Sequence, residues 1–76
     1  RPETYVIKKK DGTLYYSFYA SEFNGTVHFR GLEKGARYSV SDLWDGSDLG
    51  TADSSKDSLS IEFKQFRLLK LNRLTK

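Results

Sequence analysis

Runs of alternating apolar and polar residues, separated by turn sequences, restrict the possible folds of this chain more than any other feature. Such runs occupy residues 13–20, 26–30, 37–43 and 58–64. Successive side chains of a β-strand point to opposite faces, so each run predicts a strand with one face in the core and one in water. The residues that we expect to face the core are Leu14, Tyr16, Phe18, Ala20, Val27, Phe29, Tyr38, Val40, Leu59, Ile61 and Phe63.

Glycine-containing turns separate these runs. Residues 4–9 read as a short first strand, and Asp11-Gly12 after them is a strong hairpin signal. Asn24-Gly25 predicts a second hairpin turn of the same kind. Two further turns are expected at residues 31–35 and 45–48. Residues 49–51 read as a short return strand, and residues 52–57 read as a polar loop.

The last segment, residues 65–76, fits two structures. Its basic residues recur every three positions, as they could along a helix. Alternatively, Phe66 and Leu68, followed by Leu69 and Leu71, fit a core-facing strand that changes register at a bulge between Leu68 and Leu69. We favour the strand, because every other element of the chain reads as β.

Together these elements predict an all-β fold: a small antiparallel β-sandwich or open barrel of six to seven short strands. The 76 residues suffice for one domain. The chain begins with Arg1 and contains no methionine. We therefore expect residues 1–76 to be a single β domain of a larger protein.

The sequence offers little to a catalytic or metal site. His28 is the one histidine and there is no cysteine, so we expect no metal site. No glycine-rich phosphate loop occurs, so we expect no cofactor. No serine lies in a nucleophile elbow, and Asp42, Asp45 and Asp48 lie in and around a turn, where aspartate caps backbone N–H groups. We therefore expect no catalytic residue in this chain.

Six residues are candidates for contact with a carbohydrate or with a neighbouring domain. Pyranose rings stack on tryptophan side chains such as that of Trp44, while flanking carboxylates accept hydrogen bonds from the sugar hydroxyl groups. The same aromatic side chains also suit a protein interface. We favour the interface over the sugar platform. The candidates are Trp44, Tyr15, Tyr19, Leu43, Asp42 and Asp45.

Neither a nucleic acid nor a membrane is expected as a partner of this chain. Tyr15, Tyr19 and Tyr5 could stack on bases beside three lysines, Lys8, Lys9 and Lys10. A formal net charge of +3 is small for a protein that binds a phosphate backbone, so we expect no nucleic-acid partner. No run approaches the roughly 20 apolar residues of a membrane span, and we expect no membrane partner.

Three phrases of the sequence resemble the C-terminal β-domain of α-galactosidase-type glycoside hydrolases, the melibiase clan. They are Arg1-Pro2-Glu3, the stretch Gly31-Leu32-Glu33-Lys34-Gly35-Ala36-Arg37-Tyr38-Ser39-Val40, and Asp45-Gly46 through Leu49-Gly50-Thr51. The resemblance spans nearly the whole chain and matches the order of the family's hairpin, turns and final apolar strand.

The resemblance implies a non-catalytic C-terminal module. In that family the nucleophile and the acid/base are aspartates of a (β/α)₈ barrel that precedes the β-domain, so no catalytic residue can be transferred to this chain. The implied partner is the catalytic barrel of the same polypeptide. A stand-alone carbohydrate-binding module is the alternative, and a single-stranded nucleic-acid-binding barrel is a less favoured one.

Overall fold

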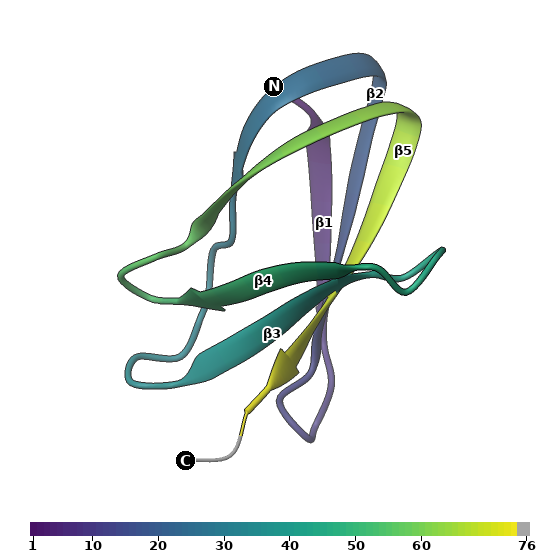
Figure 1. Cartoon of the computed structure of the whole chain (residues 1–76). Helices are drawn as coiled ribbons and strands as arrows, with labels where there is room; N and C mark the ends of the chain where they lie inside the picture. Colours follow the sequence, from purple (N-terminus) through teal and green to yellow (C-terminus); the bar gives the residue numbers. More distant parts are fainter. Residues whose placement is uncertain (75–76) are drawn as a thin grey trace.

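One antiparallel sheet forms the whole of the described structure. The computed structural model describes residues 1–74, and within them there is no helix. The strands are β1 (Glu3–Lys8), β2 (Leu14–His28), β3 (Arg37–Asp42), β4 (Asp48–Asp53) and β5 (Ser58–Arg73). Their order across the sheet is β1-β2-β5-β3-β4, so β1 and β4 are the edge strands (Figure 1).

The all-β, antiparallel prediction is confirmed, but the expected count of six to seven strands is wrong, because the sheet has five. The difference arises in β2 and β5, each of which was read from the sequence as two strands. They pair with each other from Leu14 opposite Leu71 to His28 opposite Ser58. Only a bulge interrupts this pairing, where Ser21 is the extra residue between Ala20 and Glu22.

The predicted hairpin turn at Asn24-Gly25 is wrong for the same reason. Both residues lie inside β2, where Asn24 pairs with Glu62 and Gly25 with Ile61. A type I′ turn needs positive φ at both central residues, and neither residue has it. A Cβ added to Gly25 would lie 3.1 Å from the ring of Phe23, so the ring covers the backbone where the glycine lacks a side chain. Pairing with β5 thus overrides the local turn preference.

The turn predicted at Asp11-Gly12 is confirmed. The N–H of Lys9 donates to the carbonyl of Thr13 at 2.8 Å, and the N–H of Gly12 donates to the carbonyl of Lys9 at 3.0 Å. Gly12 has a φ of 92°, a conformation that glycine adopts without a steric cost. The side chain of Asp11 accepts the N–H of Thr13 and closes the turn.

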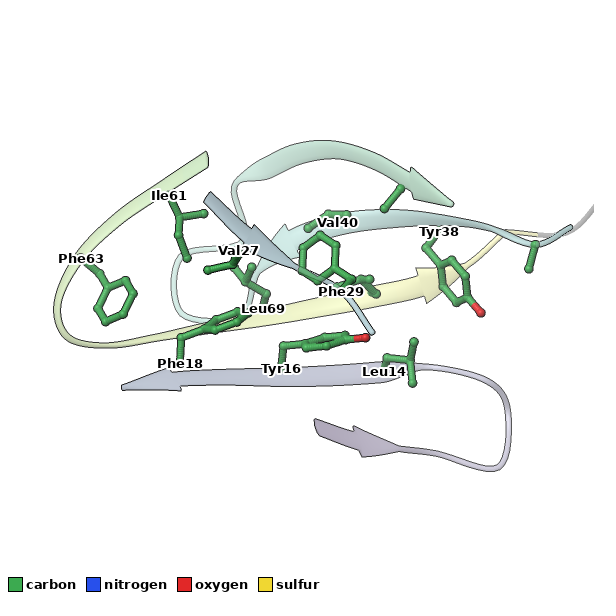
Figure 2. Close-up of a cluster of buried hydrophobic side chains, with 13 residues drawn as sticks. Leu14, Tyr16, Phe18, Val27, Phe29, Tyr38, Val40, Ile61, Phe63 and Leu69 are labelled. Carbon is green, nitrogen blue, oxygen red and sulfur yellow. The ribbon is translucent and has the colours of Figure 1, made fainter. Parts of the chain in front are cut away.

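The core lies inside the bend of the two long strands. β2 and β5 run side by side and arch over, so that their outer halves return above their own inner surface (Figure 1). The ring of Phe29 then meets the ring of Tyr16 edge-on, with centroids 5.0 Å apart. Figure 2 shows side chains from both halves filling the space between them. Every residue of the four alternating runs that was predicted to face the core is buried or packs against the buried cluster, which confirms that assignment for these runs.

The final segment is a strand as predicted as far as Arg73, where β5 ends, and residues 75 and 76 of the predicted segment lie outside the described range. The predicted bulge between Leu68 and Leu69 is wrong: Leu68 pairs with Ser17 and Leu69 with Tyr16 without a shift. Leu69 and Leu71 are fully buried. Phe66 and Leu68, two residues that the bulge was meant to bring into the core, therefore face the other side of the sheet.

Candidate functional site: the outer aromatic face

The side of the sheet opposite the core carries a second set of apolar side chains. The registers place Tyr5 opposite Ser17, Ile7 opposite Tyr15, and Tyr19 opposite Phe66, all pointing away from the core. The turn after β3 adds two residues to this side. We call the set the outer aromatic face; it consists of Tyr5, Ile7, Tyr15, Tyr19, Leu43, Trp44, Phe66 and Leu68.

Aromatic contacts connect the two ends of this face. The rings of Tyr5 and Tyr19 meet edge-on with centroids 5.9 Å apart. Phe66 is the cross-strand partner of Tyr19, and the ring of Trp44 lies edge-on to Phe66 at 6.0 Å. The N–H of Leu43 donates to the carbonyl of Leu68 at 2.9 Å and holds the turn against β5. A row of aromatic rings therefore runs from β1 across β2 and β5 to the turn between β3 and β4.

These side chains are largely open to solvent. The exposed fraction is 79% for Trp44, 61% for Ile7 and 53% for Tyr5. Tyr19 and Phe66 are exposed by 41% and 42% in spite of being neighbours. A contiguous exposed apolar surface on a small protein marks a site of contact with another molecule.

The carboxylate of Asp42 is not exposed on this face but holds the turn that carries Trp44. Its side chain is buried, with Oδ1 accepting the N–H groups of Trp44 at 2.7 Å and Asp45 at 3.0 Å. Its Oδ2 accepts a hydrogen bond from Nε of Arg67 at 2.5 Å. Burial alone would raise the pKa of Asp42, but the two N–H donors and Arg67 outweigh burial and hold that pKa below its ordinary value.

The other turn carboxylates also bond to the backbone. Oδ1 of Asp45 accepts the N–H of Ser47, and Oδ1 of Asp48 accepts the N–H of Gly50, both at 2.9 Å. The turn role expected for these aspartates is confirmed. Asp42 is therefore not free to bind a sugar hydroxyl, and its place among the contact candidates is corrected to that of a supporting residue.

The remaining candidates of the sequence analysis divide clearly. Tyr15, Tyr19, Leu43 and Trp44 all belong to the outer aromatic face. Lys8 pairs with Leu14, so its side chain lies on the core side of β1, away from these tyrosines. His28 is exposed as expected, and its Nδ1 lies 3.9 Å from Oδ1 of Asp57.

Sequence reasoning missed Phe66 and gave Ile7 no role on this face. The misplaced bulge had assigned Phe66 to the core. The alternation of β5 carried the missing signal, because Leu59, Ile61 and Phe63 are in phase with Leu69 and Leu71. Two polar residues, Gln65 and Arg67, interrupt that series and conceal its continuity.

Residues 1–74 contain no cluster of three or more histidine, cysteine, aspartate or glutamate side chains that could hold a metal ion. No helix able to cross a membrane occurs in that range either.

No protein-family model matches this chain, and no curated protein matches it.

Proposed function

We propose that this chain is the non-catalytic C-terminal accessory domain of an α-galactosidase-like glycoside hydrolase, and that it packs on and stabilises the catalytic barrel through the outer aromatic face. The observation that carries the proposal is the exposure of this face, in particular of Trp44, Ile7 and Tyr5.

The composition of the face supports a protein neighbour. The centres of protein interfaces are enriched in tyrosine, tryptophan and phenylalanine and depleted in charged residues. The outer aromatic face supplies three tyrosines, one tryptophan, one phenylalanine and three aliphatic residues, and the charged Glu3 and Lys70 lie beside it on the same side of the sheet. Burying large apolar side chains on docking yields about 1.5–3 kcal/mol for each one fully covered. Such a contact would stabilise both domains.

The carboxylates of the turn between β3 and β4 support a non-catalytic role. Glycosidases need two carboxyl groups that face the scissile bond. In this turn Asp42 is buried in an ion pair, and Asp45 and Asp48 each cap a backbone N–H. These bonds fix the turn and engage each of the three carboxylates with a backbone N–H or an arginine.

The proposed activity of the whole protein, α-galactoside hydrolysis, comes from the resemblance to the glycoside hydrolase family. The backbone angles of the glycines in the resembling phrases support that resemblance. Gly31, Gly35, Gly46 and Gly50, which belong to the resembling phrases, have φ between 76° and 98°. Other residues rarely adopt such angles. Gly31, Gly35 and Gly46 lie in turns, and Gly50 lies within β4 where its pairing with β3 shifts register. We also propose that the bent sheet serves in the whole protein as the small sandwich or open barrel expected from the sequence.

The proposal is tested in the longer protein that it requires. We expect Trp44→Ser combined with Phe66→Thr to lower the melting temperature of the catalytic barrel, while hydrolysis of an aryl α-galactoside per folded molecule stays unchanged at low temperature. Ser39→Thr, on the same side of the sheet but outside the aromatic row, serves as the control. An unchanged barrel melting temperature, or a gene that encodes no hydrolase barrel, contradicts the proposal.

A carbohydrate-binding module is the second candidate, because Trp44 is the most exposed large apolar side chain of the described residues. An indole open to solvent can stack on a pyranose ring. We would titrate the ¹⁵N-labelled chain with galactose, melibiose and raffinose and follow the amide signals. Saturable shifts around Trp44 that disappear in Trp44→Ser would favour this candidate over the accessory domain.

A further inference from the structure

We propose that the free edge of β1 and the cavity beside it bind an extended peptide segment that carries one apolar residue between two acidic ones. This goes beyond the proposed function, because it uses the edge of the sheet and not the outer aromatic face. Three observations carry it: the free hydrogen-bonding groups of β1, the shape of the cavity and the charge around both.

The first observation is that β1 exposes unused backbone groups. β1 pairs with β2 on one side and with no strand on the other, and all six of its residues are exposed. Lys9 donates to Thr13, and hydrogen-bonded pairs alternate along an antiparallel ladder. Counting back from Lys9, the peptide groups of Thr4, Val6 and Lys8 point to the free edge. These groups can bind an added strand.

The second observation is an open cavity of about 390 Å³ on the core side of this edge. Thr4 and Val6 form one wall of it, and Val27 comes from the returning half of β2. Tyr16 and Phe18 add aromatic surface. Residues paired directly across an antiparallel ladder point to the same face, so the residue of an added strand opposite Val6 points into this cavity. An apolar side chain fits there.

The third observation is the positive charge at both ends of the edge. Arg1, Arg30 and His28 line the cavity, and no acidic residue lines it. Asp57, whose Oδ1 lies 3.9 Å from Nδ1 of His28, is not among the lining residues, and Arg30 forms no ion pair with any residue of the described range. Lys8, Lys9 and Lys10 follow at the other end. Glu3, the one carboxylate of β1, accepts the hydroxyl of Tyr5.

The charges also select the occupant. In an added strand, the residues opposite Thr4 and Lys8 share the face of the residue opposite Val6. An acidic residue opposite Thr4 can reach Arg1 and Arg30, and another opposite Lys8 meets its ammonium group. A second copy of this chain would instead place Lys8 opposite Thr4, close to the two arginines, because a symmetric antiparallel pair centred on Val6 has that register. Lysines at an exposed edge commonly act against such self-pairing.

The test is an NMR titration of the ¹⁵N-labelled chain with the blocked peptide Thr-Glu-Thr-Leu-Thr-Glu-Thr, beside a control peptide with lysine in place of both glutamates. We expect the acidic peptide alone to shift amides of residues 3–9 and 26–30. Its affinity should fall as salt is raised, since exposed charges are screened. Equal shifts with both peptides, or shifts confined to other residues, overturn the proposal.

Two variants separate the backbone contribution from the charge. Val6→Pro removes an N–H that points to the free edge and leaves the bonds to β2 in place, so we expect affinity to fall about two- to tenfold, the range of one hydrogen bond. Arg30→Ala keeps the strand and should weaken binding up to about fivefold, as loss of an exposed ion pair does.

Lys64→Ala is the matched control for the charge. Lys64 lies on β5 opposite Glu22, outside the cavity, and its loss should leave affinity unchanged. Unchanged affinity in both Val6→Pro and Arg30→Ala overturns the proposal. So does self-association of the chain without peptide, measured by sedimentation, that Val6→Pro abolishes, because a second copy paired through β1 would then be the occupant.

Discussion

The two faces of the central strands β2 and β5 carry the same kinds of residue in different surroundings. On the core face, Tyr16, Phe18 and Leu69 are almost completely buried. On the outer aromatic face, Tyr19 next to Phe18 and Leu68 next to Leu69 remain open or half-buried. Phe66, the cross-strand partner of Tyr19, is open as well. The comparison shows that aromatic content alone does not locate a core. The phase of the alternation decides which rings stabilise the fold and which are available to a partner.

The largest expected difference between the faces is in stability. Leu69→Ala removes a fully buried side chain and should lower the free energy of unfolding by about 2–5 kcal/mol. A domain of this length is stable by about 4–11 kcal/mol in total. Leu68→Ala, the adjacent change on the outer aromatic face, should cost below about 1.5 kcal/mol, since its side chain is already half open. Urea unfolding of both variants measures the contrast, and equal costs would contradict the assignment of faces.

The next effect concerns the carboxylate that joins the two faces. Asp42→Ala removes the acceptor of two N–H groups and the partner of Arg67, so we expect a loss of about 1–3 kcal/mol. Because the folded-state pKa of Asp42 is lowered, its stabilisation is present above the unfolded pKa of about 3.9 and is lost as the pH falls through the folded value.

Thermal unfolding between about pH 6 and pH 2 follows this loss. The wild type should lose stability relative to Asp42→Ala as the pH falls, so that the two curves converge. Asp45→Ala, which removes a single exposed cap, is the control and should cost about 0.5–1 kcal/mol. Parallel curves for the wild type and Asp42→Ala over this range would contradict the role given to the carboxylate.

A smaller effect on stability is expected from the hydroxyl group of Tyr16 in the core. The hydroxyl of Tyr16 donates to the carbonyl of Arg30 at 2.5 Å, and burial raises the pKa of Tyr16 to about 12. A raised pKa means that this contribution is complete below the unfolded value of about 10 and is lost as the pH rises toward the folded one. Tyr16→Phe should cost about 0.5–1.5 kcal/mol at neutral pH.

Above about pH 10 the stability of the wild type should fall more steeply than that of Tyr16→Phe. Denaturant unfolding at neutral pH and at alkaline pH measures the two slopes. If both proteins lose stability in parallel, the hydroxyl of Tyr16 does not contribute to alkaline unfolding.

The smallest effect on stability is expected on the outer aromatic face itself. Phe66→Thr places a β-branched residue, which suits a strand, at this position and removes the edge contact to Trp44, so the free energy of unfolding should change by no more than about 1.5 kcal/mol. We expect the exposed apolar surface to cause weak self-association of the isolated chain, and Phe66→Thr should weaken it because that surface becomes smaller. Sedimentation at several concentrations measures it, with Ser39→Thr as the control. Unchanged self-association would show that the chain does not associate through the outer aromatic face.

Most of the fold could be predicted from local sequence because the inner residues alternate so regularly. The turn at Asp11-Gly12 and the strand character of the final segment were both recognised in this way. Asn24-Gly25 was misread, since its preference for a turn is local whereas its pairing with Glu62 and Ile61 depends on a distant strand.

The position of the bulge was not predictable by the same reasoning. The bulge occurs at Ser21, and across the ladder Gln65 has a φ of 75°, a conformation uncommon outside glycine. No residue type signals either feature. For the candidate site, the structure brings Tyr15, Tyr19, Leu43 and Trp44 to one side of the sheet, and their role in contact with another molecule stays a prediction. The burial of Asp42 depends on Arg67, which is distant in sequence.

The central position of the last strand governs how the chain can fold during synthesis. β2 lies against β5, and β3 and β4, which come between them in sequence, lie on the far side of β5. Until residues 58–73 have left the ribosome, the long β2 strand has no partner on that side and its inner aromatic residues stay uncovered. Contacts between such distant segments form slowly, and exposed strands of this kind aggregate readily. The newly made chain therefore depends on its final residues to become protected from aggregation.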